Sequence, residues 1–244
     1  EGFKSDIQAN PIINKGVIFT PVSGGFIAAI KADTGELIWK SKKYGYFSAR
    51  RGLVYWDNIK SLEPRLYFSN REKLICINAL TGEEINSFGS DGMIRTGLNV
   101  LTPVINNKNN EIIIATWDRS VEVYDLLSGA TKWKFRYYQK KNIRVGGKKY
   151  NNSGANPWGG ISFDEKRQIL YVTTGNPHAY YDGTLRPGNN VGSSSIIAID
   201  IKNKEKLWTF QETIHDIWNS DLPAPPILTT IKINNKFVDV VVNP

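Results

Sequence analysis

The feature that most constrains the fold is a segment that the chain repeats four times, at residues 27–39, 74–85, 121–133 and 196–208. Gly35, Gly82 and Gly129 occupy the same place in the first three copies, at a constant spacing of 47 residues. The fourth copy has Lys204 in that place, 75 residues after Gly129, so about 28 residues are inserted before it. A fixed interval of this length indicates a repeat architecture.

Each copy is predicted to form a strand, a tight turn and a second strand. The first strand ends at an Asp or Asn, which can cap the turn, and the glycine that follows accepts a positive φ. Three copies then carry Trp39, Trp133 or Trp208, which we expect to be buried between neighbouring sheets. The second copy has Asn86 in that place, with Phe88 two residues later. The predicted strands are 17–20, 27–32, 66–69, 74–78, 112–116, 121–125, 169–174 and 196–200.

About four strands in each interval is typical of a blade of an all-β propeller. A β-sandwich of short strands is the competing fold, but it would not repeat at a fixed spacing. We therefore predict one partial propeller over 1–244 with about four blades. The last apolar run, 240–242, stands at the end of the chain, and we expect further blades to be missing from it. The predicted blades are 11–48, 49–95, 98–137 and 154–212, with the start of a fifth at 213–244.

Several other classes are excluded by composition. No run of about 18 apolar residues is present for a membrane-spanning helix, and residues 1–10 lack the pattern of a signal peptide. The single cysteine, Cys76, rules out an internal disulfide, and its apolar surroundings predict a buried thiol. His178 and His215 are too few to hold zinc without carboxylates.

The net charge of +8 raises the question of a nucleic-acid partner. Residues 132–149 hold eight lysines and arginines and no acidic residue. No motif of a nucleic-acid-binding module accompanies this run. We interpret it as a solvated basic loop or a surface-docking patch, and we expect no nucleic-acid partner.

Three segments outside the repeat carry a family resemblance. They are RGLVYW at 51–56, GANPWGGIS at 154–162 with YVTTGNP at 171–177, and HDIWNSDLPAPP at 215–226. Together with the Asp-Thr-Gly and Trp pattern of the blades, they resemble the pyrroloquinoline quinone (PQQ) dehydrogenases. The last segment is most similar to the membrane-bound glucose dehydrogenase branch. The resemblance covers essentially the whole chain and implies an eight-bladed propeller.

The resemblance also implies a site at the propeller centre, where PQQ lies with Ca²⁺ or another hard cation. Trp158 matches the indole that forms the floor beneath the quinone, Arg51 matches a cofactor-binding arginine, and Asn156 belongs to the same cofactor segment. Asn176 matches a metal ligand through its amide oxygen. Each has a structural alternative: blade packing for Trp158, a blade-edge salt bridge for Arg51, and a plain turn for Gly175–Pro177.

Two departures from the family pattern concern the catalytic groups. The base of the family is an Asp that follows the Trp of the third segment, and this chain has Asn219 there. An amide cannot take a hydroxyl proton at neutral pH. Asp216 and Asp221 flank it and are candidate replacements, with a turn cap and a structural carboxylate as their alternatives. The family's Glu metal ligand has no clear counterpart in residues 114–120, where Asp118 is the only stand-in.

The implied activity is oxidation of an alcohol or sugar hydroxyl, with proton removal by the base and hydride transfer to the quinone. The implied partners are that small-molecule substrate and a respiratory electron acceptor such as a quinone or cytochrome, and the implied location is the periplasm. Two other classes stay open: a catalytically silent quinoprotein-like propeller, favoured by Asn219, and a protein-binding scaffold propeller. The three segments above argue against the scaffold, because a scaffold does not need them.

Overall fold

The computed structural model describes residues 8–57, 63–138, 142–151 and 153–243. Nearly all of the regular structure is antiparallel β-sheet, as predicted; the exceptions among the described residues are two single-turn 3₁₀ helices, Asn107–Asn109 and Gly183–Leu185. No helix in these ranges is long and apolar enough to cross a membrane. The chain divides into two compact units. Unit 1 is Glu1–Thr116 with Glu122–Lys134, and unit 2 is Trp117–Val121 with Phe135–Pro244.

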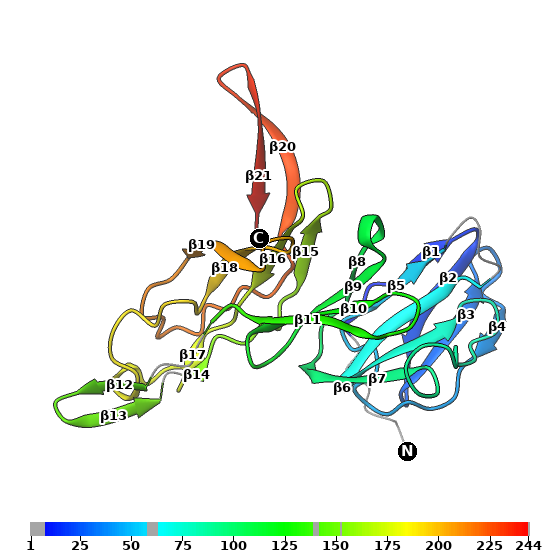
Figure 1. Ribbon diagram of the computed structural model, residues 1–244, viewed down its shortest axis with the longest axis horizontal. Helices are drawn as coiled ribbons and strands as arrows, with labels where there is room; N and C mark the ends of the chain where they lie inside the picture. Colours follow the sequence, from blue (N-terminus) through cyan, green and yellow to red (C-terminus); the bar gives the residue numbers. More distant parts are fainter. Residues whose placement is uncertain (1–7, 58–62, 139–141, 152, 244) are drawn as a thin grey trace. The chain divides into compact units, whose positions relative to one another are not determined.

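Unit 1 contains sheets whose strands follow one another in chain order (Figure 1). The first sheet comprises β1 (Ile12–Asn14), β2 (Val17–Val22), β3 (Phe26–Lys31) and β4 (Leu37–Lys40). The second comprises β5 (Leu53–Trp56), β6 (Arg65–Asn78) and β7 (Met93–Asn99). The third, whose strands β10 and β11 cross the boundary between the units, comprises β8 (Val104–Asn106), β9 (Glu111–Ala115), β10 (Ser120–Asp125) and β11 (Thr131–Arg136).

The core of unit 1 lies between successive sheets. One buried cluster joins the first and second sheets through Phe19, Ile27, Leu66 and Phe68. Another joins the second and third sheets; its members include Tyr67, Leu74, Cys76, Ile112, Ile114 and Tyr124. Face-to-face packing of consecutive meandering sheets is the arrangement of propeller blades. It explains why the inner strands read as continuous apolar runs, since both of their faces are covered.

The turns of the repeat have the geometry that the sequence predicted. Gly35, Gly82 and Gly129 have φ values of 74°, 77° and 73°, and Lys204 adopts the same left-handed conformation with φ 59°. The preceding side chain caps the turn: Asn78 Oδ1 accepts a hydrogen bond from the Leu80 amide at 2.7 Å. Asp125 Oδ1 accepts one from the Ser128 amide at 2.8 Å, and Asp200 Oδ1 one from the Asn203 amide at 2.9 Å.

The second copy of the repeat differs from the prediction. The expected strands 66–69 and 74–78 form one strand, β6, because no glycine or proline interrupts it; Arg71, with φ 54°, lies between its two halves. No strand follows Gly82 within this described stretch, where only an isolated bridge between Ile77 and Glu84 forms. Turns at residues 86–88 and near Gly92 redirect the chain into β7, which pairs with β6 instead.

The aromatic residues of the repeat pack on the turn of the next copy. Trp39 is half-buried and donates a hydrogen bond from Nε1 to the Ala79 carbonyl at 3.1 Å. A Cβ atom added at Gly82 would lie 2.5 Å from the Trp39 ring, so the ring rests directly on that glycine. Phe88, fully buried, occupies the same place against Gly129, which the sequence had assigned to Asn86.

The prediction that all three repeat tryptophans are largely buried is wrong. Trp133 is only half-buried, like Trp39. Trp208 is 41% exposed and contacts Tyr171, with 5.8 Å between the ring centroids. Trp208 lies on β19 (Glu205–Gln211), the edge strand of its sheet, most of whose side chains are exposed.

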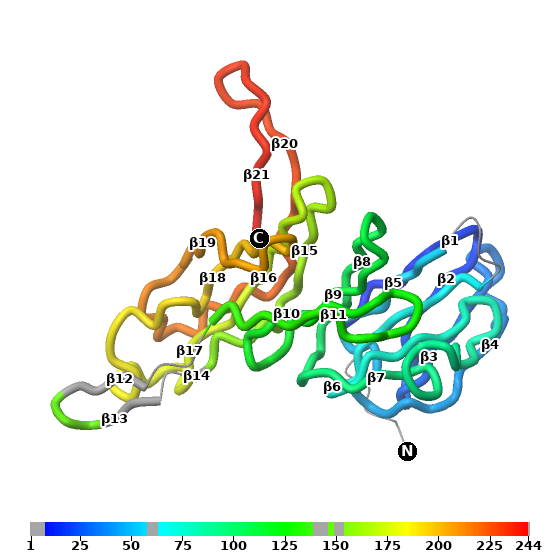
Figure 2. The backbone as a smooth tube through the Cα atoms, in the orientation of Figure 1, coloured from blue at the N-terminus to red at the C-terminus, as the bar shows by residue number. Residues whose placement is uncertain are grey.

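Unit 2 contains a four-stranded sheet and a long hairpin. The sheet has the order β15 (Ile161–Asp164), β16 (Ile169–Thr173), β18 (Ser195–Asp200) and β19 (Glu205–Gln211). The hairpin of β20 (Ile227–Ile233) and β21 (Lys236–Val242) projects beyond this sheet, in red in Figure 2. Leu222, Leu228 and Val241 pack with Tyr171 and Ile196 of the sheet. Shorter pairs are β12 (Asn142–Val145) with β13 (Lys148–Asn151), and β14 (Ser153–Gly154) with β17 (Pro177–His178).

The basic run at 132–149 begins on β11 and continues into the β12–β13 hairpin. On β11 its charges meet acidic groups: Lys132 Nζ lies 3.5 Å from Glu111 Oε1, and Lys134 Nζ lies 3.0 Å from Glu122 Oε1. Arg136 is paired with Asp118. This half of the run is therefore locally neutralised. Residues 139–141 lie outside the described ranges.

Candidate active site

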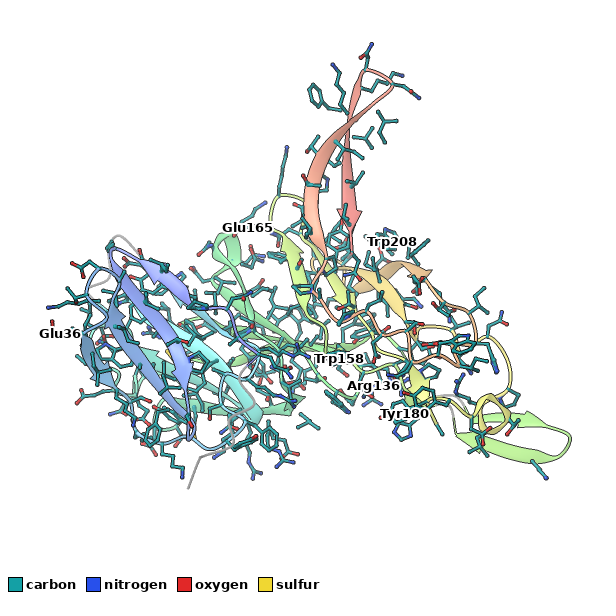
Figure 3. The ribbon with its side chains drawn as sticks, turned by 180° about the vertical axis from the view of Figure 1, so that it is seen from behind. Glu36, Arg136, Trp158, Glu165, Tyr180 and Trp208 are labelled. Atoms are coloured by element: carbon teal, nitrogen blue, oxygen red, sulfur yellow. The ribbon has the colours of Figure 1, made fainter. Side chains whose placement is uncertain are left out.

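Trp158 is held at the start of the unit 2 sheet, just before β15 (Figure 3). Two glycines follow it. A Cβ atom at Gly159 would overlap the Leu222 carbonyl, and one at Gly160 would lie 2.6 Å from Pro225. The absence of side chains therefore lets this segment lie against residues 222–225. The indole is half-buried, and its Nε1 donates a hydrogen bond to Asp221 Oδ1 at 3.1 Å.

Asp221 is the carboxylate on the Trp158 side. Its Oδ1 also accepts the backbone amide of Asn176 at 2.6 Å. Gly175 packs into the same corner: a Cβ atom there would overlap Asp221 Oδ1 and lie 2.5 Å from Trp158 Nε1. Among the described residues, Oδ2 of Asp221 has no hydrogen-bond donor. One oxygen thus fixes the carboxylate against the indole, and the other is available as a proton acceptor or ligand.

Asn176 and Asn219 contact each other directly, because Asn176 Nδ2 donates to Asn219 Oδ1. Asn176 is buried, and its amide oxygen is the end that remains for a ligand. Asn219 is exposed and has a left-handed backbone, with φ 65°. The contact places Asn219, the predicted base position, next to Asn176, the predicted metal ligand.

Asp216 is a turn cap rather than an exposed acid. It is 1% exposed, and both of its oxygens are used locally. Oδ1 accepts the Trp218 amide at 2.8 Å, and Oδ2 accepts the Ser220 amide at 2.7 Å and the Ser194 hydroxyl at 3.2 Å. These bonds shape the turn that carries Asn219 and Asp221.

Arg186 supports this turn from the inserted segment of the fourth repeat, and the sequence interpretation missed it. It is 1% exposed; NH1 donates to Asn190 Oδ1 at 2.7 Å, and NH2 donates to the carbonyls of Tyr180 and Asp216. Burial lowers the pKa of this guanidinium, and nearby Asp216 opposes that shift. The available signal was an Arg-Pro-Gly sequence within a 28-residue insertion, which resembles an ordinary loop.

Asn156 links the site to the loop after β9. Its Nδ2 donates to the Trp117 carbonyl at 2.7 Å, and its own carbonyl accepts the Gly175 amide at 3.0 Å. Asp118 in that loop is engaged with Arg136. Arg51 belongs to unit 1, half-buried before β5, with its carbonyl accepting the Thr102 hydroxyl at 2.8 Å. The structure therefore brings Asn156, Trp158, Asn176, Asp216, Asn219 and Asp221 into one unit, and the approach of Arg51 to them stays a prediction.

The residues present fit a planar ring better than they fit a metal ion. A half-buried indole with a fixed edge is a suitable surface for stacking. For a hard cation, the site offers the oxygens of Asn176 and Asp221, whereas Ca²⁺ takes six to eight. The described residues contain no group of three or more His, Cys, Asp or Glu that could hold a metal. The described residues by themselves therefore do not provide a complete cation site.

The repeated blades and the Trp158 segment define a quinoprotein-type propeller. Over residues 1–244 the sequence matches the PQQ family described as "Glucose/ethanol/alcohol dehydrogenase, beta-propeller domain", and the chain belongs to this family.

Individual relatives share about a quarter of its residues. It is 24% identical to the quinate/shikimate dehydrogenase (quinone) of Acinetobacter baylyi, covering 88% of this chain and 32% of the relative. It is 24% identical to quinoprotein glucose dehydrogenase A of Acinetobacter calcoaceticus, covering 92% and 34%.

The quinohemoprotein alcohol dehydrogenase of Comamonas testosteroni is also 24% identical, covering 94% and 36%. Its crystal structure superposes with a TM-score of 0.75 at 20% identity over 98% of this chain and 40% of that one, which confirms the fold. The chain spans about a third of the length of these curated relatives.

Proposed function

We propose that the intact protein is a PQQ-dependent dehydrogenase that oxidises the hydroxyl group of an alcohol or sugar. The bound quinone would supply the hydride acceptor. The observation that carries the proposal is the shared carboxylate: Asp221 Oδ1 holds the edge of the Trp158 indole and the Asn176 amide together. Such a reaction needs three groups from this part of the protein: a ring platform, an amide oxygen and a carboxylate, close together.

Within this proposal Asp221 is the base. Its free Oδ2 can accept the hydroxyl proton of the substrate while Oδ1 keeps the carboxylate in place. Asp216 is a poor candidate, because both of its oxygens already bind the turn and it is 1% exposed. Asn219 has no proton-accepting group. The base function would thus have moved two residues along the turn.

Two substitutions of the intact protein test the assignment. Asp221→Asn keeps an oxygen that can accept the Trp158 and Asn176 hydrogen bonds but removes the charge, so turnover should fall by roughly the 10²–10⁴-fold that general-base catalysis contributes. Asn219→Asp is the matched control and should leave turnover nearly unchanged. The opposite pattern, a large gain in Asn219→Asp and little loss in Asp221→Asn, would place the base at residue 219.

Cofactor binding is tested separately by titrating PQQ against the intrinsic tryptophan fluorescence. Replacing Trp158 by Ala should weaken PQQ binding by about tenfold or more, since one aromatic stacking contact contributes about 0.5–1.5 kcal/mol beyond its buried area. Trp208→Ala is the control, because Trp208 is exposed and contacts Tyr171 instead. Equal PQQ affinity in wild type and Trp158→Ala would remove the cofactor platform from the proposal.

The second candidate function is a catalytically silent propeller, which the occupation of the base position by Asn219 favours. It predicts PQQ binding without turnover in wild type and in both substituted forms.

As part of the main proposal, a respiratory quinone or cytochrome takes the electrons, and the protein works in the periplasm. A hard cation beside the quinone would bind the Asn176 amide oxygen.

A further inference from the structure

The second half of the basic run at 132–149 has no acidic side chain within its own segment to neutralise it. The first half, on β11, is paired with acidic groups of other segments. None of residues 126–163 is acidic. The charges of the second half are Lys140, Lys141, Arg144, Lys148 and Lys149. The candidate active site contains none of them.

The β12–β13 hairpin, which carries three of these charges, has an open tip. Its strands form a two-stranded sheet of their own, and Figure 1 shows the hairpin extending past the β14–β17 pair. Gly146 and Gly147 make the two-residue turn, with φ 56° and 79°. A Cβ atom on either glycine would meet no atom of the described residues within 4 Å, and residues 146–148 are exposed. The tip is therefore accessible to a surface outside the chain.

The register divides the hairpin into two faces, because residues directly opposite one another in an antiparallel pair share a face. One face has polar and basic positions only: Asn142, Arg144, Lys149 and Asn151. The other has three apolar or aromatic positions and one lysine: Ile143, Val145, Tyr150 and Lys148. The hairpin is thus amphipathic.

The register also sets Arg144 directly opposite Lys149. Like charges at opposed positions destabilise a β-pair. An anionic surface against the hairpin offsets this repulsion, because both cations are then attracted to it. The sequence therefore concentrates positive charge in an arrangement that an anionic partner stabilises.

Exposed tyrosines accompany the hairpin at its base. Ser153, two residues after β13, pairs with His178 at the start of the inserted segment of the fourth repeat. Tyr180 and Tyr181 follow and are 45% and 70% exposed; Figure 3 labels Tyr180. A tyrosine has an apolar ring and a polar tip, which suits the boundary between a bilayer and water.

We propose that the β12–β13 hairpin, with Tyr180 and Tyr181 at its base, binds the surface of an anionic phospholipid bilayer. The basic residues meet the headgroup phosphates, and the tyrosines and the apolar face of the hairpin enter the headgroup boundary. An acidic protein would also attract the charges, but basic and apolar residues on opposite sides of one projecting element are typical of interfacial elements. The proposal does not depend on cofactor binding or turnover.

The charge is tested with Arg144→Gln/Lys149→Gln in the intact protein, by sedimentation with two kinds of vesicle. One is phosphatidylcholine alone, and the other has equal parts of phosphatidylcholine and phosphatidylglycerol. The excess of binding to the second isolates the anionic lipid. Lys202→Gln/Lys206→Gln is the matched control, since it removes the same charge from exposed positions of the same unit.

The wild type should prefer the anionic vesicles and should be released from them at about 1 M salt, where the Debye length is about 3 Å. The Arg144→Gln/Lys149→Gln form should bind them about 10- to 30-fold more weakly, since each basic residue near such a surface contributes about fivefold. The control should change binding less than twofold. Equal binding of the wild type to both vesicles, or no effect of the double substitution, overturns the proposal.

The bilayer is distinguished from an acidic protein by Tyr181→Ser and by soluble polyglutamate as a second probe. Tyr181→Ser should weaken vesicle binding severalfold and leave polyglutamate binding unchanged, whereas Tyr46→Ser, at an exposed tyrosine of unit 1, should change neither. Tight binding of polyglutamate together with vesicle binding that ignores Tyr181→Ser would identify an acidic partner and overturn the proposal.

A melting curve without lipid separates binding from folding. Because Arg144→Gln/Lys149→Gln removes a repulsion across the hairpin, its melting temperature should equal or exceed that of the wild type. A lower melting temperature would assign the two residues a structural role and overturn the proposal.

Discussion

The contact of Trp39 with Gly82 gives a quantitative test of how consecutive repeats hold together. Truncation of a large buried aromatic to Ala costs about 3–5 kcal/mol. Trp39 is half-buried, so Trp39→Ala should lower the free energy of unfolding by an amount near the lower end of this range, about 3 kcal/mol. About 1 kcal/mol of that is the hydrogen bond from Nε1 to the Ala79 carbonyl, which Trp39→Phe removes by itself.

The glycine side of the contact provides the control. Gly82→Ala adds a Cβ atom 2.5 Å from the Trp39 ring at φ 77°, so it combines a steric clash with backbone strain. Gly35→Ala has nearly the same φ, 74°, with no atom within 4 Å, so it isolates the strain of roughly 1–2 kcal/mol. The difference in destabilisation between Gly82→Ala and Gly35→Ala therefore measures the clash of the new methyl group with the Trp39 ring.

The measurement is urea unfolding of the four single variants and of the double variant Trp39→Ala/Gly82→Ala. Because Trp39→Ala removes the ring with which the new methyl group clashes, the double variant should be more stable than the sum of the single effects predicts, by about 1–2 kcal/mol. Equal destabilisation by Gly82→Ala and Gly35→Ala, with no coupling to Trp39→Ala, would refute the docking of this ring on the next turn.

Two further predictions concern buried polar groups. Burial raises the pKa of the Cys76 thiol to about 12, so iodoacetamide at pH 8 should leave the native protein unlabelled. In urea the same reagent should modify one thiol per chain, which mass spectrometry would detect. Labelling of the native protein would contradict the burial of this thiol. Arg186→Met should lower the free energy of unfolding by about 2–4 kcal/mol, since it leaves buried carbonyls and the Asn190 amide oxygen without a donor. As the control, Arg167→Met at an exposed ion pair should change the free energy of unfolding by under about 1 kcal/mol.

The fold was predictable because its local signals agree with one another. The repeat spacing, the Asp or Asn caps and the turn glycines each predict the same hairpin, and the structure has positive φ at Gly35, Gly82 and Gly129. The failures are at positions where tertiary packing decides. Phe88, not Asn86, packs on the next turn of the repeat, because its ring reaches Gly129 from a different backbone path, which spacing alone does not reveal. Trp208 is exposed because it lies on the edge strand β19.

The candidate site was predictable only as a set of residues. Family resemblance selected Trp158, Asn176 and the turn with Asn219 and Asp221, and the structure places these side chains in contact. It could not separate Asp216 from Asp221, because their roles depend on which backbone amides each carboxylate meets. Arg186 was not selected either, since an arginine in a loop is usually a solvated charge, and only its burial distinguishes it.

The position of the Asp221 carboxylate depends on the residue at position 175. The carboxylate must approach the indole edge and the Asn176 amide at once, and a side chain at residue 175 would occupy that corner, so Gly175 is a condition for the arrangement. Asn219 is exposed and accepts a hydrogen bond from Asn176 Nδ2 through Oδ1, and an Asp side chain at residue 219 could accept the same bond. Asn219→Asp therefore keeps this hydrogen bond and changes only the charge at residue 219, which is why it isolates that charge while Asp221 stays the proposed base.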